Sequence, residues 1–108
     1  MVQLPPSIFD LLESENFRRR PGMYLSSPTI SILFGFITGY FYAVDANDVT
    51  LKDMDKLNGF NDFVANHYGW LESTAGWRNI ILKESGGDEK KAFTRFFELY
   101  DVFVSRTT

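Results

Sequence analysis

The stretch that decides the fold is ISILFGFITGYFYAV, which occupies positions 30–44. Wound as a helix, it carries apolar side chains on nearly every side. We therefore predict a helix from about Pro28 to Ala46, with Ser27 as its N-cap. Such a helix is typically buried at the centre of a domain or covered by a partner. A membrane span needs roughly 20 apolar residues, so this shorter run argues against one.

Two glycines interrupt this stretch. Gly35 and Gly39 lie four residues apart and so share one face of the helix. In lipid this spacing marks a dimerisation face. Here we expect instead that another helix packs closely against the bare backbone at Gly39.

The rest of the chain also reads as helical. We predict a first helix that starts after Ser7 and ends before Pro21, and then an ordered loop up to Ser27. The polar region 45–56 reads as an exposed connection that could contain a short helical turn. A third helix is predicted over about Asn58–His67, with Gly69 as its C-cap.

The C-terminal part adds two further helices. We predict a fourth over about Ala75–Lys83, although region 70–83 could instead contain a short strand. A fifth begins near Asp88 as N-cap. It carries a stripe of core aromatic residues at helical spacing, namely Phe93, Phe96, Phe97, Tyr100 and Phe103. The prediction is an all-α fold, a compact bundle of about five helices around a central apolar helix.

Composition bounds the class of protein. The 108 residues suit a single helical domain over 1–108, and 44% are apolar. The absence of cysteine fits a reducing compartment, and Met1–Asp10 does not resemble a secretory signal, so we expect a cytoplasmic protein. The net charge of −3 makes nucleic acid a poor partner and suits a basic protein instead, although the same charge also serves solubility.

No motif in the chain predicts catalysis. His67 is the only histidine, and no nearby residue completes a metal site, so we predict no metal and no cofactor. No serine stands in a nucleophile elbow, and Gly86-Gly87 is too short to cradle a phosphate. We therefore expect a protein that is not an enzyme.

Two sets of residues stand out as candidates. The arginine run 18–20 ends the first helix, where we favour a structural role over phosphate binding, and Arg20 could fold back to hold the turn. The acidic region 45–62 is the candidate partner-binding surface. Its aspartates are Asp45, Asp48, Asp53, Asp55 and Asp62. The candidate structural motif comprises Arg20, Pro21, Gly22, Met23, Tyr24, Gly39 and Trp77.

Several of these segments carry a resemblance. The string Arg-Pro-Gly-Met-Tyr also occurs near the start of the gyrase B ATPase domain, but this chain lacks the nucleotide motif of that domain, so we reject ATP binding. A wider resemblance covers most of the chain. It rests on the segments 20–25, 39–40, 60–64, 73–77 and 92–99. In these segments the chain resembles a small bacterial family associated with toxin–immunity loci, including contact-dependent growth inhibition.

The resemblance implies a non-enzymatic immunity protein that binds and neutralises the C-terminal domain of a cognate toxin, such as a nuclease. Two alternatives stay open. One is a structural or adaptor domain that forms a homo-oligomer through the second helix. The other is a domain that binds a small ligand, with Tyr24, Tyr40, Trp77 and Arg20 around a pocket.

Overall fold

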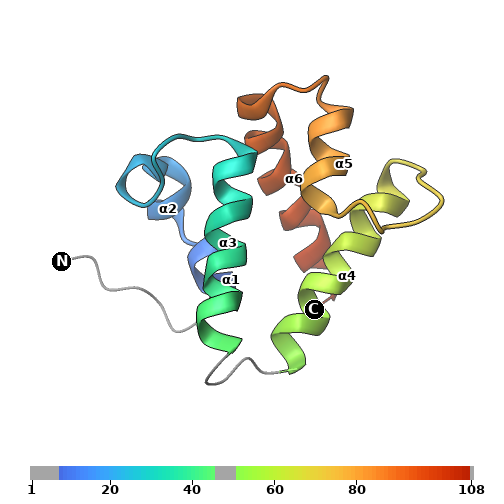
Figure 1. Cartoon of the computed structure of the whole chain (residues 1–108), viewed down its shortest axis with the longest axis horizontal. Helices are drawn as coiled ribbons and strands as arrows, with labels where there is room; N and C mark the ends of the chain where they lie inside the picture. The colour runs from blue at the N-terminus through green and yellow to red at the C-terminus, as the bar shows by residue number, and fades with distance from the viewer. Residues whose placement is uncertain (1–7, 46–50, 108) are drawn as a thin grey trace.

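The computed structural model describes residues 8–45 and 51–107, and the side chains within 8–43 and 55–106. Within these residues the chain is all-α and contains no strand (Figure 1). The elements are α1 (Ile8–Leu12), α2 (Glu15–Arg19), the 3-10 helix η1 (Pro21–Met23), α3 (Ile30–Asp45), α4 (Leu51–His67), α5 (Trp77–Glu84) and α6 (Glu89–Thr107). The all-α prediction is confirmed, and α5 settles the choice between helix and strand in favour of the helix.

The long C-terminal helix α6 lies against α3, α4 and α5 (Figure 1). Its predicted aromatic stripe is buried along its whole length, from Phe93 at 6% exposed to Phe103 at 7%. Asp88 caps the helix as predicted, because its Oδ1 accepts the N–H groups of Lys90 at 3.1 Å and Lys91 at 3.0 Å. The stripe therefore forms the centre of the hydrophobic core.

Trp77 joins α5 to this core. Its ring lies 4.8 Å from the ring of Phe96 and 6.1 Å from that of Phe60, measured between centroids. Its backbone N–H donates to Oδ1 of Asn61 at 2.8 Å, so a side chain of α4 satisfies a free donor at the start of α5. One residue thus ties together three helices.

The prediction of a single first helix is wrong, because the structure has two short helices, α1 and α2, in its place. Ser14 is extended, with φ −77° and ψ 128°, and it separates α1 from α2. Leu12 and Phe17 are 2% and 0% exposed. Five residues apart, they would point well away from each other on one continuous helix. The break lets both side chains enter the core. The predicted cap Ser7 lies outside the described residues.

The start of α3 also differs from the prediction. The helix begins at Ile30, and Thr29 rather than Ser27 stands at its N-terminus. The Thr29 carbonyl accepts the Leu33 N–H at 3.0 Å, and its hydroxyl lies 3.4 Å from the Ile32 nitrogen. The loop before it is ordered as predicted. Pro21 opens η1, and its carbonyl accepts from Tyr24 at 2.9 Å.

Helix α4 is longer than predicted and takes up the second half of the predicted connection, because it begins at Leu51 rather than near Asn58. Leucine, lysine and methionine within 51–57 are strong helix formers. Lys56 holds this first part of the helix against α1, since its Nζ lies 4.5 Å from the centroid of the Phe9 ring. At the other end Gly69 has φ 73° and closes the helix, as predicted.

Helix α3 buries one face and exposes the other. Ile30, Leu33, Ile37 and Phe41 face the core. The close helix crossing predicted at Gly39 is absent, because a Cβ built on Gly35 or Gly39 would meet none of the described atoms within 4 Å. The glycine spacing was read as a contact inside the domain, yet the two glycines lie on the exposed side. No helix of the described part is long and apolar enough to cross a membrane.

Candidate functional site

Only two of the five candidate aspartates have described side chains. Asp55 and Asp62 are exposed on α4. Asp45 ends α3 and Asp53 lies in α4, but their side chains are outside the described set, and Asp48 lies outside the described residues altogether. Asp55 and Asp62 are seven residues apart, so they share one face of the helix. Asn58 and Asn66 lie on the same face and are also exposed.

The loop between α4 and α5 is fixed beside this face. The Ser73 hydroxyl donates to Oδ1 of Asp62 at 2.6 Å. The Trp70 N–H donates to the Ala65 carbonyl at 2.9 Å, and its indole N–H donates to Glu84 at 3.0 Å. Figure 1 shows the loop projecting beyond the end of α4. These bonds hold the loop on both sides of Leu71.

Leu71 is the most exposed large apolar residue on this loop, at 104% of its reference area. Its neighbour Glu72 is exposed as well. We call the combined region the α4 surface. It consists of Asp55, Asn58, Asp62 and Asn66 on α4 with Leu71 and Glu72 of the loop. The α4 surface thus combines one exposed apolar side chain with three exposed carboxylates.

The carboxylates of the α4 surface have no cationic partner among the described side chains. The ion pairs among the described side chains join Arg18 to Asp101, Lys56 to Glu13, and Arg95 to Glu98. None of them uses Asp55, Asp62 or Glu72. The α4 surface therefore presents net negative charge to the solvent.

Of the arginine run, Arg18 is structural. Its guanidinium donates two hydrogen bonds to Asp101 of α6, at 2.9 and 2.8 Å. Its Nε donates to the Leu12 carbonyl at 2.7 Å, and its Cζ lies 4.9 Å from the centroid of the Phe97 ring. One side chain thus fixes the break between α1 and α2 against α6. Sequence spacing gave no sign of this, because 83 residues separate the two partners.

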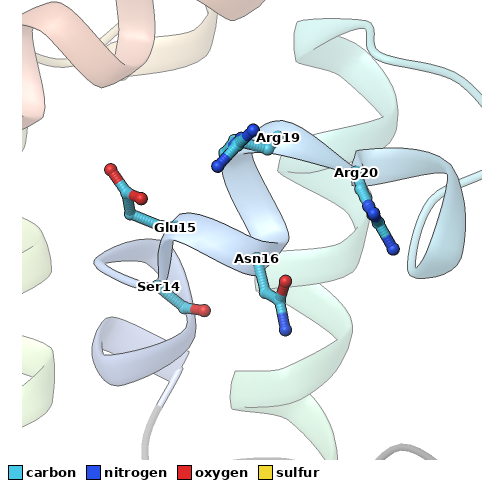
Figure 2. A pocket seen from close by; sticks show the side chains of 5 residues that line it. All are labelled: Ser14, Glu15, Asn16, Arg19 and Arg20. Atoms are coloured by element: carbon cyan, nitrogen blue, oxygen red, sulfur yellow. The ribbon is translucent and has the colours of Figure 1, made fainter.

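Arg19 and Arg20 are exposed and line an open surface pocket of about 460 Å³ with Ser14, Glu15 and Asn16. Figure 2 shows that these side chains leave α2 in different directions: Glu15 and Arg19 point to one side and Asn16 and Arg20 to the other. They do not converge on one point, as the polar groups of a ligand site do. The Arg20 side chain makes no hydrogen bond to the described part of the Pro-Gly turn. The Met23 N–H instead donates to the Arg20 carbonyl at 3.1 Å.

A second cavity lies inside the core. It measures about 10 Å³ and is lined by Phe9, Leu12, Ile37, Leu57, Phe60, Trp77, Phe96 and Tyr100. A space of this size holds one water molecule at most, and its apolar lining offers no partner to one. Trp77 is among its walls, but Tyr24, Tyr40 and Arg20 are not. The grouping expected for a small-ligand pocket is therefore not formed around either cavity.

His67 lies at the exposed end of α4. Its Nε2 is 3.3 Å from Nη2 of Arg95, and its ring contacts those of Phe63 and Tyr68. An arginine only donates hydrogen bonds, so His67 can take part in a bond here only as the acceptor. Among the described side chains, no three histidine, aspartate or glutamate residues gather closely enough to hold a metal ion.

One polar cluster escaped the sequence analysis. Glu89, at the start of α6, accepts the backbone N–H of Ser31 at 2.9 Å and its hydroxyl at 2.7 Å. Arg78 of α5 donates to the same hydroxyl at 2.7 Å. The hydrogen bonds from Ser31 lower the pKa of the Glu89 carboxyl below its usual value. The cluster joins the N-terminal ends of three helices. The only feature of the sequence that pointed to this cluster was a glutamate in the first turn of a predicted helix. Such a residue commonly contacts only its own helix.

Comparison of the chain with protein-family profiles, with curated proteins and with solved structures finds no match.

Proposed function

We propose that this chain is a non-enzymatic protein-binding domain, and that its α4 surface receives the basic C-terminal domain of a bacterial toxin, which it neutralises. The observation that carries the proposal is the combination of exposed carboxylates that form no ion pair among the described side chains with one fully exposed leucine on an ordered loop. The choice of a toxin as the partner rests on the resemblance to the toxin–immunity family. An inhibitor of this kind would meet its toxin in the cytoplasm.

The charges of the α4 surface favour a basic partner. Asp55, Asp62 and Glu72 form none of the ion pairs among the described side chains, and the whole chain carries a net charge of −3. Complementary charge accelerates encounter and orients the two proteins before contact. A nuclease domain has a basic groove for its substrate, so an acidic surface that fills this groove would exclude the nucleic acid.

Leu71 supplies the apolar contact that charge alone does not provide. At 104% exposure, it has almost its whole side-chain area left to bury. Binding energy in protein interfaces is concentrated in a few side chains that enter well-packed pockets, and the centre of an interface is more apolar than its rim. The hydrogen bond from Ser73 to Asp62 holds the loop before binding, which lowers the entropy lost when the loop is immobilised.

A growth-protection assay tests the proposal. The toxin domain encoded beside the gene is expressed in cells with or without this chain. We expect the wild-type chain to restore growth, and Leu71→Ala and Asp55→Lys to restore it less. Both positions are exposed, so neither substitution should unfold the domain. Truncating Leu71 should weaken binding by about 1–2 kcal/mol.

The matched control is Glu15→Lys. It makes the same change of charge at an exposed acidic residue of α2, away from the α4 surface, and should protect as well as the wild type. Equal loss of protection in Asp55→Lys and Glu15→Lys would mean that only net charge matters. Full protection by both α4-surface variants would reject the α4 surface as the binding site.

A further inference from the structure

The face of α3 that turns away from the core is made of uncharged residues. We call it the α3 outer face. Its exposed members are Ile32, Gly35, Thr38, Gly39, Tyr42 and Ala43. Ile32 is 39% exposed and Tyr42 is 86% exposed. Since no described atom lies within 4 Å of a Cβ built on either glycine, this stretch of helix backbone is open to a neighbour.

The spacing of the large and small residues along this face is symmetric. Ile32, Gly35, Gly39 and Tyr42 are separated by three, four and three residues. At 100° per residue, the four positions fall within an arc of about 80°. The order large–small–small–large is the same when the helix is read in either direction. Two antiparallel copies of α3 related by a two-fold axis would therefore pair Ile32 with Tyr42 and Gly35 with Gly39, each pair occurring twice.

Charge also favours a second copy over a different partner on this face. The stretch from Ile30 to Val44 contains no charged residue. A two-fold axis brings a surface close to its own copy, so any charge near the axis would meet a like charge and repel it. The α3 outer face has no charged residue, so two copies of it would not repel each other. A basic partner, conversely, would find no carboxylate on it.

We propose that the α3 outer face binds a second copy of this chain as an antiparallel, two-fold symmetric helix pair. The glycines let the two backbones approach closely, and Ile32 of each copy packs against Tyr42 of the other. A helix of 16 residues is about 24 Å long, so the interface is small and we expect weak association. The pair uses a different helix from the α4 surface and does not depend on the proposed function.

Sedimentation equilibrium tests the association. The wild-type chain should approach twice its mass of 12.5 kDa as its concentration rises toward about 1 mM. Tyr42→Glu places a charged carboxylate against the apolar Ile32 of the other copy and should raise the dissociation constant at least about tenfold. Val102→Glu is the matched control, since it makes the same kind of change at a 42% exposed position of α6, and it should associate like the wild type. A wild type that stays monomeric, or equal behaviour of the two variants, would overturn the proposal.

Disulfide trapping tests the antiparallel register. The chain has no cysteine, so Ile32→Cys and Tyr42→Cys each introduce a single thiol. Oxidation of a mixture of the two variants should yield mainly the disulfide between positions 32 and 42, which mass spectrometry distinguishes from the same-residue dimers. Either variant oxidised alone should cross-link much more slowly. Efficient cross-linking of each variant with itself would indicate a parallel pair and would contradict the proposed register.

Discussion

Replacing Phe97 with alanine should strongly destabilise the domain. The side chain is 8% exposed. Its ring centroid lies 5.0 Å from that of Phe96, 5.2 Å from that of Phe93 and 6.2 Å from that of Phe17, and the guanidinium of Arg18 covers its face. Truncating a buried phenylalanine costs about 3–5 kcal/mol, because apolar contact is lost and a cavity is left. A domain of this size has about 5–15 kcal/mol of stability in total, so the loss is a large share of it.

Urea denaturation followed by far-ultraviolet circular dichroism measures this loss. In thermal unfolding it corresponds to a fall in Tm of roughly 12–20 °C. Val102→Ala is the control on the same helix, where a 42% exposed side chain should contribute less than about 1 kcal/mol. A loss below about 1 kcal/mol for Phe97→Ala would refute the reasoning, because it would mean that this face of α6 is not core.

Three further predictions follow from particular contacts. Gly39→Ala should stabilise the monomer by about 0.5–1 kcal/mol, measured by urea denaturation, because alanine favours the helix and a Cβ at this position meets no described atom outside the helix's own backbone. A loss of stability would mean that another part of the chain packs against Gly39. Because the folded pKa of Glu89 is lowered, its contribution to stability is complete at neutral pH and is lost as the pH falls below the ordinary glutamate pKa. Wild type and Glu89→Gln should therefore differ in unfolding free energy at pH 7, and the difference should shrink in acid; a difference that grows in acid would contradict this prediction. A double-mutant cycle of Arg18→Ala and Asp101→Ala should give a coupling of about 0.5–1 kcal/mol, limited by the 58% exposure of the Asp101 side chain, and no coupling would mean that the ion pair adds nothing.

Patterns within one helix were readable from the sequence. The aromatic stripe of α6 and the cap at Asp88 follow from spacing and from short-range hydrogen bonding alone, and both are present. Gly69 was predicted as a C-cap from the same local reasoning. Each of these features depends on residues three or four positions apart, and helix geometry alone determines which of those side chains are in contact.

Boundaries set by tertiary contacts could not be predicted. The break at Ser14 exists because Leu12 and Phe17 both enter the core, and the sequence alone does not say where the core lies relative to the first helix. The early start of α4 is supported by Lys56 over the Phe9 ring, a contact between helices far apart in the chain. Local propensity is a weak guide where such contacts decide.

The candidate sites divide in the same way. The sequence predicted an acidic partner-binding region, of which Asp55 and Asp62 are exposed in the structure, but the exposure of Leu71 and the bond between Ser73 and Asp62 appear only in the folded chain. The prediction that another helix crosses α3 at its glycines was wrong. The spacing of the glycines shows which face of the helix they share, but it does not show what covers that face. Glu89 and Ser31 are 58 residues apart, beyond the reach of any local pattern.

The most direct test of the central claim is capture of the tagged chain with its partners from its native cells, read by mass spectrometry. The account predicts that one basic toxin domain is recovered in near-stoichiometric amount by the wild type and by Glu15→Lys, and is largely lost with Asp55→Lys. Recovery of this chain alone, from cells in which the neighbouring genes are demonstrably expressed, would contradict the account.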